Sequence, residues 1–203
     1  MKTGRDTERE TNAEDGMDQE ESIVSVLSPE EAALLIEDHM AVQLLCGAQG
    51  PESAFEFHQF LKSAMNIVFR IVHPDRAYLL LVDPMTGTLV PKVIQRKEKE
   101  GKGDGVGVSQ TIIRKVVEEK KAVLSLDART DPRFAGSESI QIHGIRSVLC
   151  VPLQSDDQVL GILHVDRMLP HGEFKQDDLI LLSAMGTILA LAVEKFYRHS
   201  PHR

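Results

Sequence analysis

The sequence predicts an α+β domain in which helices cover both faces of a central antiparallel sheet. The strongest observation is the stretch from His143 to Asp166, where two apolar runs rich in β-branched and aliphatic residues flank the polar stretch 154–158. This is the pattern of a β-hairpin. Alternation along the first run places Val148 and its neighbour Leu149 on opposite faces, so both faces of the sheet are apolar and need a cover. Segments of helical periodicity elsewhere in the chain supply these covers.

Two helices are predicted ahead of the sheet. In the first, Ser28 can act as the N-cap, Pro29 suits the first helical position and Glu31 can complete a capping box. This helix ends before Gly47. The second covers residues 53–72 and has a clear apolar face, as expected of a helix packed on a sheet. That face consists of Phe57, Phe60, Leu61, Ala64, Val68 and Ile71.

Three further strands and a short helix are expected between this helix and the hairpin. Residues 77–82 and 89–94 form apolar runs on either side of a turn. Pro91 removes a backbone donor from the second run, so this strand is expected at or near an edge of the sheet. Ser109 is expected to cap a short helix, and residues 123–126 give a third strand.

The last helix is predicted from Asp177 to Tyr197, and apolar residues occupy most of its circumference. Packing on the sheet accounts for one set of these residues, namely Leu182, Met185, Leu189 and Val193. A second set is left for another surface, either a second subunit or the N-terminal helix. That set is Ile180, Ala184, Ile188 and Leu191.

Composition suggests how the chain divides. Residues 1–22 contain eight acidic and three basic residues and no aliphatic residue larger than Met, which predicts a disordered acidic tail. Residues 23–50 are expected to form a linker or dimerisation helix, residues 53–197 the folded domain, and residues 198–203 a second disordered tail.

Several classes of function are disfavoured. The formal net charge of -8 and the lack of clustered Lys and Arg argue against nucleic-acid binding. No stretch of 18 apolar residues and no signal-like segment occurs, so we expect a cytoplasmic protein that is not inserted in a membrane. The two cysteines, Cys46 and Cys150, belong to no CxxC pair, and the histidines give no metal-binding pair. We therefore predict no metal site, and the sequence identifies no cofactor.

The longest irregular segment, 127–144, is the candidate binding site because long loops within compact domains usually serve a site. Together with the start of the following strand, it offers seven candidate ligand-binding residues: Asp127, Arg129, Arg133, Phe134, Ser139, His143 and Arg146. The alternative is that the Asp and Arg side chains pair with one another and fix the loop to itself. Both interpretations remain open at the level of sequence.

Residues from about 53 to 196, roughly seven tenths of the chain, resemble a GAF domain. The similarity lies in the segments SQTIIRKVVEEKKAVLSLDARTDPRF, IRSVLCVPLQSDDQVLGILHVDR and GEFKQDDLILLSAMGTILALAVE. The S-x-S-I pattern before the second segment is most similar to GAF domains that follow a forkhead-associated domain in bacterial signalling proteins. The resemblance implies a profilin-like sheet of five or six strands, a ligand pocket roofed by the long loop, and dimerisation through the terminal helices.

The resulting functional hypothesis is a non-enzymatic sensory or regulatory module that binds a small molecule or a partner. It would dimerise through the helices from Ser28 to Cys46 and from Asp177 to Tyr197. One alternative is a ligand-free interaction scaffold, and another is a cyclic-nucleotide-binding GAF domain, although the N-K-x-F-D-E signature is absent. Cys150 lies within an apolar strand and does not suit bilin attachment or redox chemistry. His164 is expected to be a hydrogen-bonded sheet residue rather than a haem ligand.

Overall fold

The computed structural model describes residues 51, 53–97, 107–134, 136–137, 140, 144–168 and 172–199. The predicted acidic tail and the helix expected over 28–46 lie outside these residues. In chain order the elements are α3 (Ala54–Val72), β1 (Arg76–Val82), β2 (Leu89–Arg96), α4 (Gln110–Glu119), β3 (Val123–Ser125), the 3-10 turn η1 (Pro132–Phe134), β4 (Ile145–Ser155), β5 (Gln158–Met168) and α6 (Gln176–His199). The last helix therefore includes Arg198 and His199, which the sequence placed in a tail.

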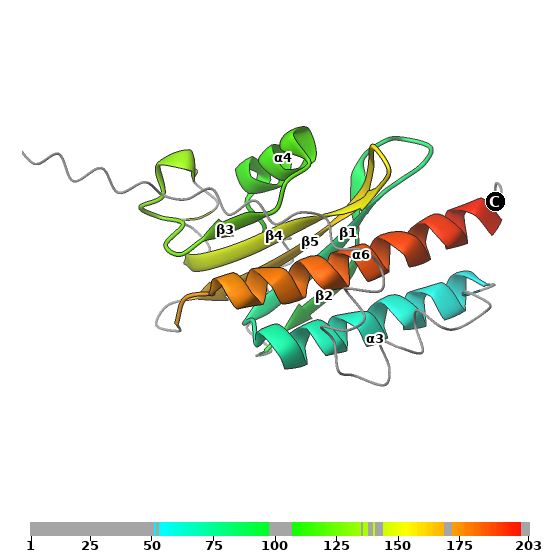
Figure 1. Ribbon diagram of the computed structural model, residues 1–203, viewed down its shortest axis with the longest axis horizontal. Helices are drawn as coiled ribbons and strands as arrows, with labels where there is room; N and C mark the ends of the chain where they lie inside the picture. Colours follow the sequence, from blue (N-terminus) through cyan, green and yellow to red (C-terminus); the bar gives the residue numbers. More distant parts are fainter. Residues whose placement is uncertain are drawn as a thin grey trace, which may run out of the picture.

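The five strands form one antiparallel sheet in the order β2-β1-β5-β4-β3. Helices α3 and α6 lie side by side on one face, and α4 covers the other (Figure 1). These findings confirm the predicted α+β class and the GAF-like arrangement. Strand β2 is an edge strand, as Pro91 predicted, and its register with β1 shifts opposite this proline.

Each face of the sheet has its own apolar core. Leu149, Val151 and Leu153 of β4 pack in the core shared with α3 and α6. Val148 and Cys150 belong to the core that includes α4. The alternation seen in the sequence therefore assigns these residues to the correct faces. Burial raises the pKa of the Cys150 thiol, so this side chain is protonated and unreactive at neutral pH.

The predicted helix starts are confirmed where the structure describes them. Ser53 caps α3 by accepting a hydrogen bond from the Glu56 amide at 3.1 Å. The Glu56 carboxylate in turn accepts one from the Ser53 amide at 3.3 Å, which completes a capping box. Ser109 Oγ caps α4 by accepting from the Ile112 amide. Local sequence therefore fixes where both helices begin.

The β4–β5 hairpin is tighter than the sequence suggested. Only Asp156 and Asp157 lie in the turn, because Gln154 and Ser155 continue the ladder opposite Val159 and Gln158. The side chains of Gln154 and Ser155, whose polarity suggested a five-residue turn, have hydrogen-bond partners in the fold. Ser155 Oγ donates to Glu194 Oε2 of α6 at 2.6 Å, and Gln154 Nε2 donates to the Asp156 carbonyl.

Helix α6 is buried more completely by its own chain than expected. Ala184 and Ile188, which the sequence left for a second subunit or the N-terminal helix, are 0% and 1% exposed and belong to the core that α6 shares with α3 and the sheet. Neighbouring α3 helps to cover α6, and the rings of Phe57 and Phe196 stack with their centroids 3.9 Å apart. By length and hydropathy alone α6 could span a membrane, and 50% of its most apolar 18-residue window is buried against the rest of the domain. Leu191 remains 38% exposed.

Candidate functional site

The first part of the candidate loop is held by a pair of adjacent side chains. Asp127 accepts hydrogen bonds from the Arg129 amide at 3.1 Å and from Arg129 Nη2 at 2.9 Å. The hydrogen bond from the Arg129 side chain is the main reason that the pKa of Asp127 lies below its ordinary value. Both residues are therefore charged at neutral pH and engaged with each other.

A second pair attaches the loop to strand β3. Arg133 donates to Asp131 through Nε and Nη2, and its Nη2 also donates to the Leu124 carbonyl at 2.7 Å. Asp131 is only 8% exposed and also accepts from Ser125 Oγ at 2.6 Å. The neighbouring Phe134 is buried in the core on the α4 face. This half of the loop is therefore an anchored structure.

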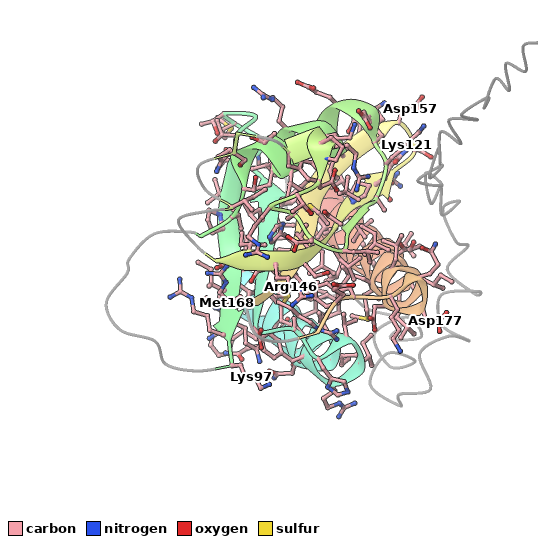
Figure 2. All side chains as sticks on the ribbon, turned by 90° about the vertical axis from the view of Figure 1, so that its left-hand side faces the viewer. Lys97, Lys121, Arg146, Asp157, Met168 and Asp177 are labelled. Atoms are coloured by element: carbon pink, nitrogen blue, oxygen red, sulfur yellow. The ribbon has the colours of Figure 1, made fainter. Side chains whose placement is uncertain are left out.

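Arg146, the remaining described candidate, lies at an irregularity in β4, where Ile145 pairs with Met168 but Ser147 pairs with Arg167. Its Nη2 donates to Glu173 Oε1 at 2.8 Å. Figure 2 shows Arg146 at the end of the sheet that also carries Met168.

All three described arginine candidates are thus paired with a carboxylate of the chain, which confirms that the loop's Asp/Arg pairs bind each other. The other two candidates, Ser139 and His143, lie outside the described residues. Whether any of the seven binds a ligand stays a prediction.

Acid should weaken the contribution of Asp131 to stability. Burial alone would raise its pKa, but hydrogen bonds from Arg133 and Ser125 outweigh burial and hold it below the ordinary value of 3.8. A carboxyl whose pKa is lowered by folding stabilises the fold above its unfolded pKa, and this contribution disappears as pH falls through the folded pKa. Asp131→Asn should therefore be less stable than the parent at about pH 7, and the difference should shrink below about pH 4.

Urea unfolding at both pH values would measure this difference. The exposed Asp157→Asn is the matched control, and its free energy of unfolding should stay within about 0.5 kcal/mol of the parent. A difference between Asp131→Asn and the parent that is the same at both pH values would contradict the role given to this carboxylate.

A second polar group, not anticipated from the sequence, lies on the α4 face of the sheet. Strands β1 and β5 pair with Arg76 opposite Asp166 and Tyr78 opposite His164. Arg76 Nε donates to Asp166 Oδ1 at 2.7 Å. The Tyr78 and His164 rings meet edge to face, with centroids 5.8 Å apart. We call Arg76, Tyr78, His164 and Asp166 the strand cluster.

Several hydrogen-bonding atoms of the strand cluster are buried without a partner among the described residues. Tyr78, His164 and Asp166 are each 0% exposed. Yet both ring nitrogens of His164 and Asp166 Oδ2 have no hydrogen-bond partner among the described residues. Burial raises the pKa of Tyr78 overall, although Arg96, beside the Tyr78 hydroxyl, acts to lower that pKa. His164 Nε2 lies 3.6 Å from Asp166 Oδ2, beyond hydrogen-bonding distance. Buried polar atoms without partners are costly, about 1–3 kcal/mol each, and are uncommon in native proteins.

The expectation for His164 is therefore only half correct. The residue lies in the sheet as predicted, but its ring is not hydrogen-bonded to any described residue. A signal was present in the sequence, since Arg76 and Tyr78 occupy alternate positions of β1, and His164 and Asp166 alternate positions of β5. The sequence did not indicate that β1 and β5 are neighbours in the sheet.

The strand cluster and the loop meet in one core. Tyr78 packs in the same apolar cluster as Phe134 and Ile140 of the loop and Ile112 of α4. The loop and α4 therefore cover the strand cluster from the same side. Within the described part of the chain, no group of three or more His, Cys, Asp or Glu side chains is arranged to hold a metal ion. The strand cluster itself offers hydrogen-bonding groups and the charges of Arg76 and Asp166.

Comparison with known proteins agrees with this architecture. The family model described as GAF domain matches residues 56–193. The chain is 29% identical over 143 residues to the nitrogen fixation protein AnfA of Azotobacter vinelandii. That match covers 67% of this chain but only 27% of AnfA, so the chain spans about a quarter of the length of this relative.

Two solved structures share the fold. The GAF domain of the cyanobacteriochrome TePixJ has a TM-score of 0.60 at 15% identity and covers 79% of this chain and 99% of that domain. The GAF domain of a two-component sensor histidine kinase from Bacillus halodurans has a TM-score of 0.52 at 20% identity, covering 71% of this chain and 95% of that domain.

Proposed function

Since this chain belongs to the GAF domain family, which occurs in sensory and regulatory proteins, we propose that it is a non-enzymatic sensory module that binds a small molecule. The observation that carries the proposal is the set of unpaired polar atoms in the strand cluster, beneath the loop. A ligand that completes these hydrogen bonds would recover part of the cost of burying them. The buried thiol of Cys150 offers no nucleophile, which supports a role other than catalysis.

The atoms concerned suggest what the ligand must carry. Tyr78 Oη can donate a hydrogen bond, Asp166 Oδ2 can accept one, and the His164 ring supplies at least one N–H donor. A suitable ligand therefore has a donor and an acceptor close together. The seven candidates of the loop region stay predicted ligand contacts. Among the candidate arginines Arg129, Arg133 and Arg146, the Arg129 side chain is the most exposed, at 39%.

Ligand binding is testable on the purified full chain. Native mass spectrometry would reveal a copurified molecule, and thermal-shift screening would test cyclic nucleotides, nucleotides and metabolites. A ligand at 100 times its dissociation constant should stabilise the fold by about 2.7 kcal/mol. His164→Phe should remove that stabilisation, whereas His58→Phe, on the exposed side of α3, should retain it.

The alternative to ligand binding is an interaction scaffold. The Asp127–Arg129 and Asp131–Arg133 pairs support it, because a loop held by internal ion pairs needs no ligand to stay in place. No copurified mass and no stabilisation by any compound would favour the scaffold. Stabilisation by cyclic nucleotides alone would favour the cyclic-nucleotide variant of the proposal.

We further propose that the module is a homodimer joined through its terminal helices, in the cytoplasm of a bacterium. The outer side of the α3–α6 layer carries Phe55, 71% exposed, and Leu191, 38% exposed. Leu191→Glu should shift the sedimentation coefficient to that of a monomer. Leu126→Glu, at a residue 51% exposed outside the helix layer, is the control and should leave the mass unchanged. A parent protein that is monomeric at tens of micromolar would contradict the dimer.

A further inference from the structure

We propose that Ser147 is a positioning residue that connects the loop segment 127–134 to the start of α6, so that a displacement of the loop changes how α6 is held on the sheet. The use of this connection in signalling rests on the proposed function. The connection itself is a property of the ligand-free chain. It is a continuous series of buried hydrogen bonds that runs through Asp131, Ser125, Ser147 and Phe174.

The first half of the series leads from the loop into the sheet. Ser125 Oγ, in β3, donates to Asp131 Oδ2 of the loop at 2.6 Å. Ser147 Oγ, in the adjacent β4, donates to the Ser125 carbonyl at 2.9 Å. Ser125 therefore contacts the loop through its own side chain, and it contacts Ser147 through its own backbone carbonyl. A shift of Asp131 that moves Ser125 also moves the acceptor used by Ser147.

The second half leads from the sheet to the helix. Ser147 Oγ accepts a hydrogen bond from the Phe174 amide at 3.0 Å, and α6 begins two residues later, at Gln176. A serine hydroxyl has one hydrogen to donate. In Ser147 this hydrogen is donated to the Ser125 carbonyl, and an oxygen lone pair accepts the hydrogen bond from the Phe174 amide. Rotation of the Ser147 side chain about its Cα–Cβ bond would move Oγ and disrupt both bonds together. Ser147 thus couples its two neighbours through one oxygen atom.

Burial makes this series stiff. Asp131 is 8% exposed, and Ser125, Ser147 and Phe174 are at most 1% exposed. Solvent therefore has little access to take the place of a broken bond, and each lost bond carries its full cost.

Other contacts extend the connection to α3. Arg167, opposite Ser147 on β5, donates to the Glu173 carbonyl at 2.7 Å and to the Val72 carbonyl at the end of α3 at 2.8 Å. Its guanidinium also lies 4.3 Å from the centroid of the Phe174 ring. The segment 173–174 is thus a junction where the loop, the sheet and both helices meet. Figure 2 shows this end of the molecule, with Arg146, Met168 and Asp177 labelled.

A second serine offers a natural control. Ser155 Oγ also joins β4 to α6, through Glu194 Oε2 at 2.6 Å. It lies at the other end of β4, and its hydrogen bond to Glu194 does not involve the loop segment 127–134. Ser147 and Ser155 thus make comparable bonds to α6, but only Ser147 belongs to the series that reaches the loop.

Amide hydrogen exchange on the ligand-free full chain tests the proposal. The reporter is the Leu179 amide in the first turn of α6, which donates to the Lys175 carbonyl. The Val116 amide of α4 reports opening elsewhere. Asp131→Ala should speed exchange at Leu179 by about 3- to 10-fold, the effect of one lost hydrogen bond, and by less at Val116.

The decisive comparison uses two backgrounds. In Ser147→Ala the same Asp131→Ala change should no longer affect Leu179, whereas in Ser155→Ala it should keep its full effect. The proposal is wrong if Asp131→Ala leaves Leu179 unchanged in the parent, if its effect persists in Ser147→Ala, or if both reporters change equally. Should Ser147→Ala fail to fold, Ser147→Cys would replace it, because the thiol has a similar shape but forms weaker hydrogen bonds. Since no ligand is present, failure here is distinct from failure of ligand binding.

Discussion

Arg76→Leu is expected to lower the free energy of unfolding by about 3–5 kcal/mol, the largest effect predicted for any single change in this protein. Arg76 Nε contacts Asp166 Oδ1 at 2.7 Å, and the side chains are 10% and 0% exposed. Removal of the arginine leaves a carboxylate buried with no opposite charge directly against it. Urea unfolding at neutral pH, monitored by circular dichroism, would measure the loss.

Two control variants test whether the loss comes from leaving the Asp166 charge buried without a partner. Adding Asp166→Leu to Arg76→Leu should recover much of the loss, because the uncompensated charge is then gone. Lys115→Met removes one partner of the Lys115–Glu119 pair, whose side chains are 28% and 43% exposed, and should cost no more than about 0.5 kcal/mol. If Arg76→Leu lowered the free energy of unfolding as little as Lys115→Met, the Asp166 carboxylate would not be shielded from solvent as the structure indicates.

Gly161→Ala is expected to destabilise the fold by about 1–3 kcal/mol through overpacking. Strands β1 and β5 approach so closely at this position that a Cβ atom on Gly161 would lie 2.4 Å from the Leu80 carbonyl oxygen and 2.7 Å from a methyl group of Leu81. The obstacle includes backbone, so relief requires the two strands to separate. Thermal and urea unfolding would report the change as a lower midpoint.

Gly172→Ala is the matched control, since a Cβ atom there would meet nothing within 4 Å. It should leave stability within about 0.5 kcal/mol of the parent or raise it slightly by restricting the unfolded chain. Equal destabilisation by the two changes would show that lost glycine flexibility, and not the contact between β1 and β5, is responsible.

The candidate site was only partly accessible from the sequence. The Asp127–Arg129 and Asp131–Arg133 pairs are close in sequence, and their pairing could be anticipated. The strand cluster could not, because Arg76 and Asp166 are 90 residues apart and meet only when β5 inserts between β1 and β4. Ser147 escaped notice for a similar reason: its partners, Ser125 and Phe174, lie on different elements.

By itself the sequence determined the α+β class, the helix starts at Ser53 and Ser109, the edge position of β2 and the faces occupied by the central apolar residues of β4. These features follow from periodicity, capping and the missing donor of Pro91, which act within a few residues. Tertiary structure decided which strands are neighbours, how fully α6 is covered and which buried polar atoms lack partners. Those outcomes depend on contacts between distant segments, and such contacts form only when both faces of the sheet are packed.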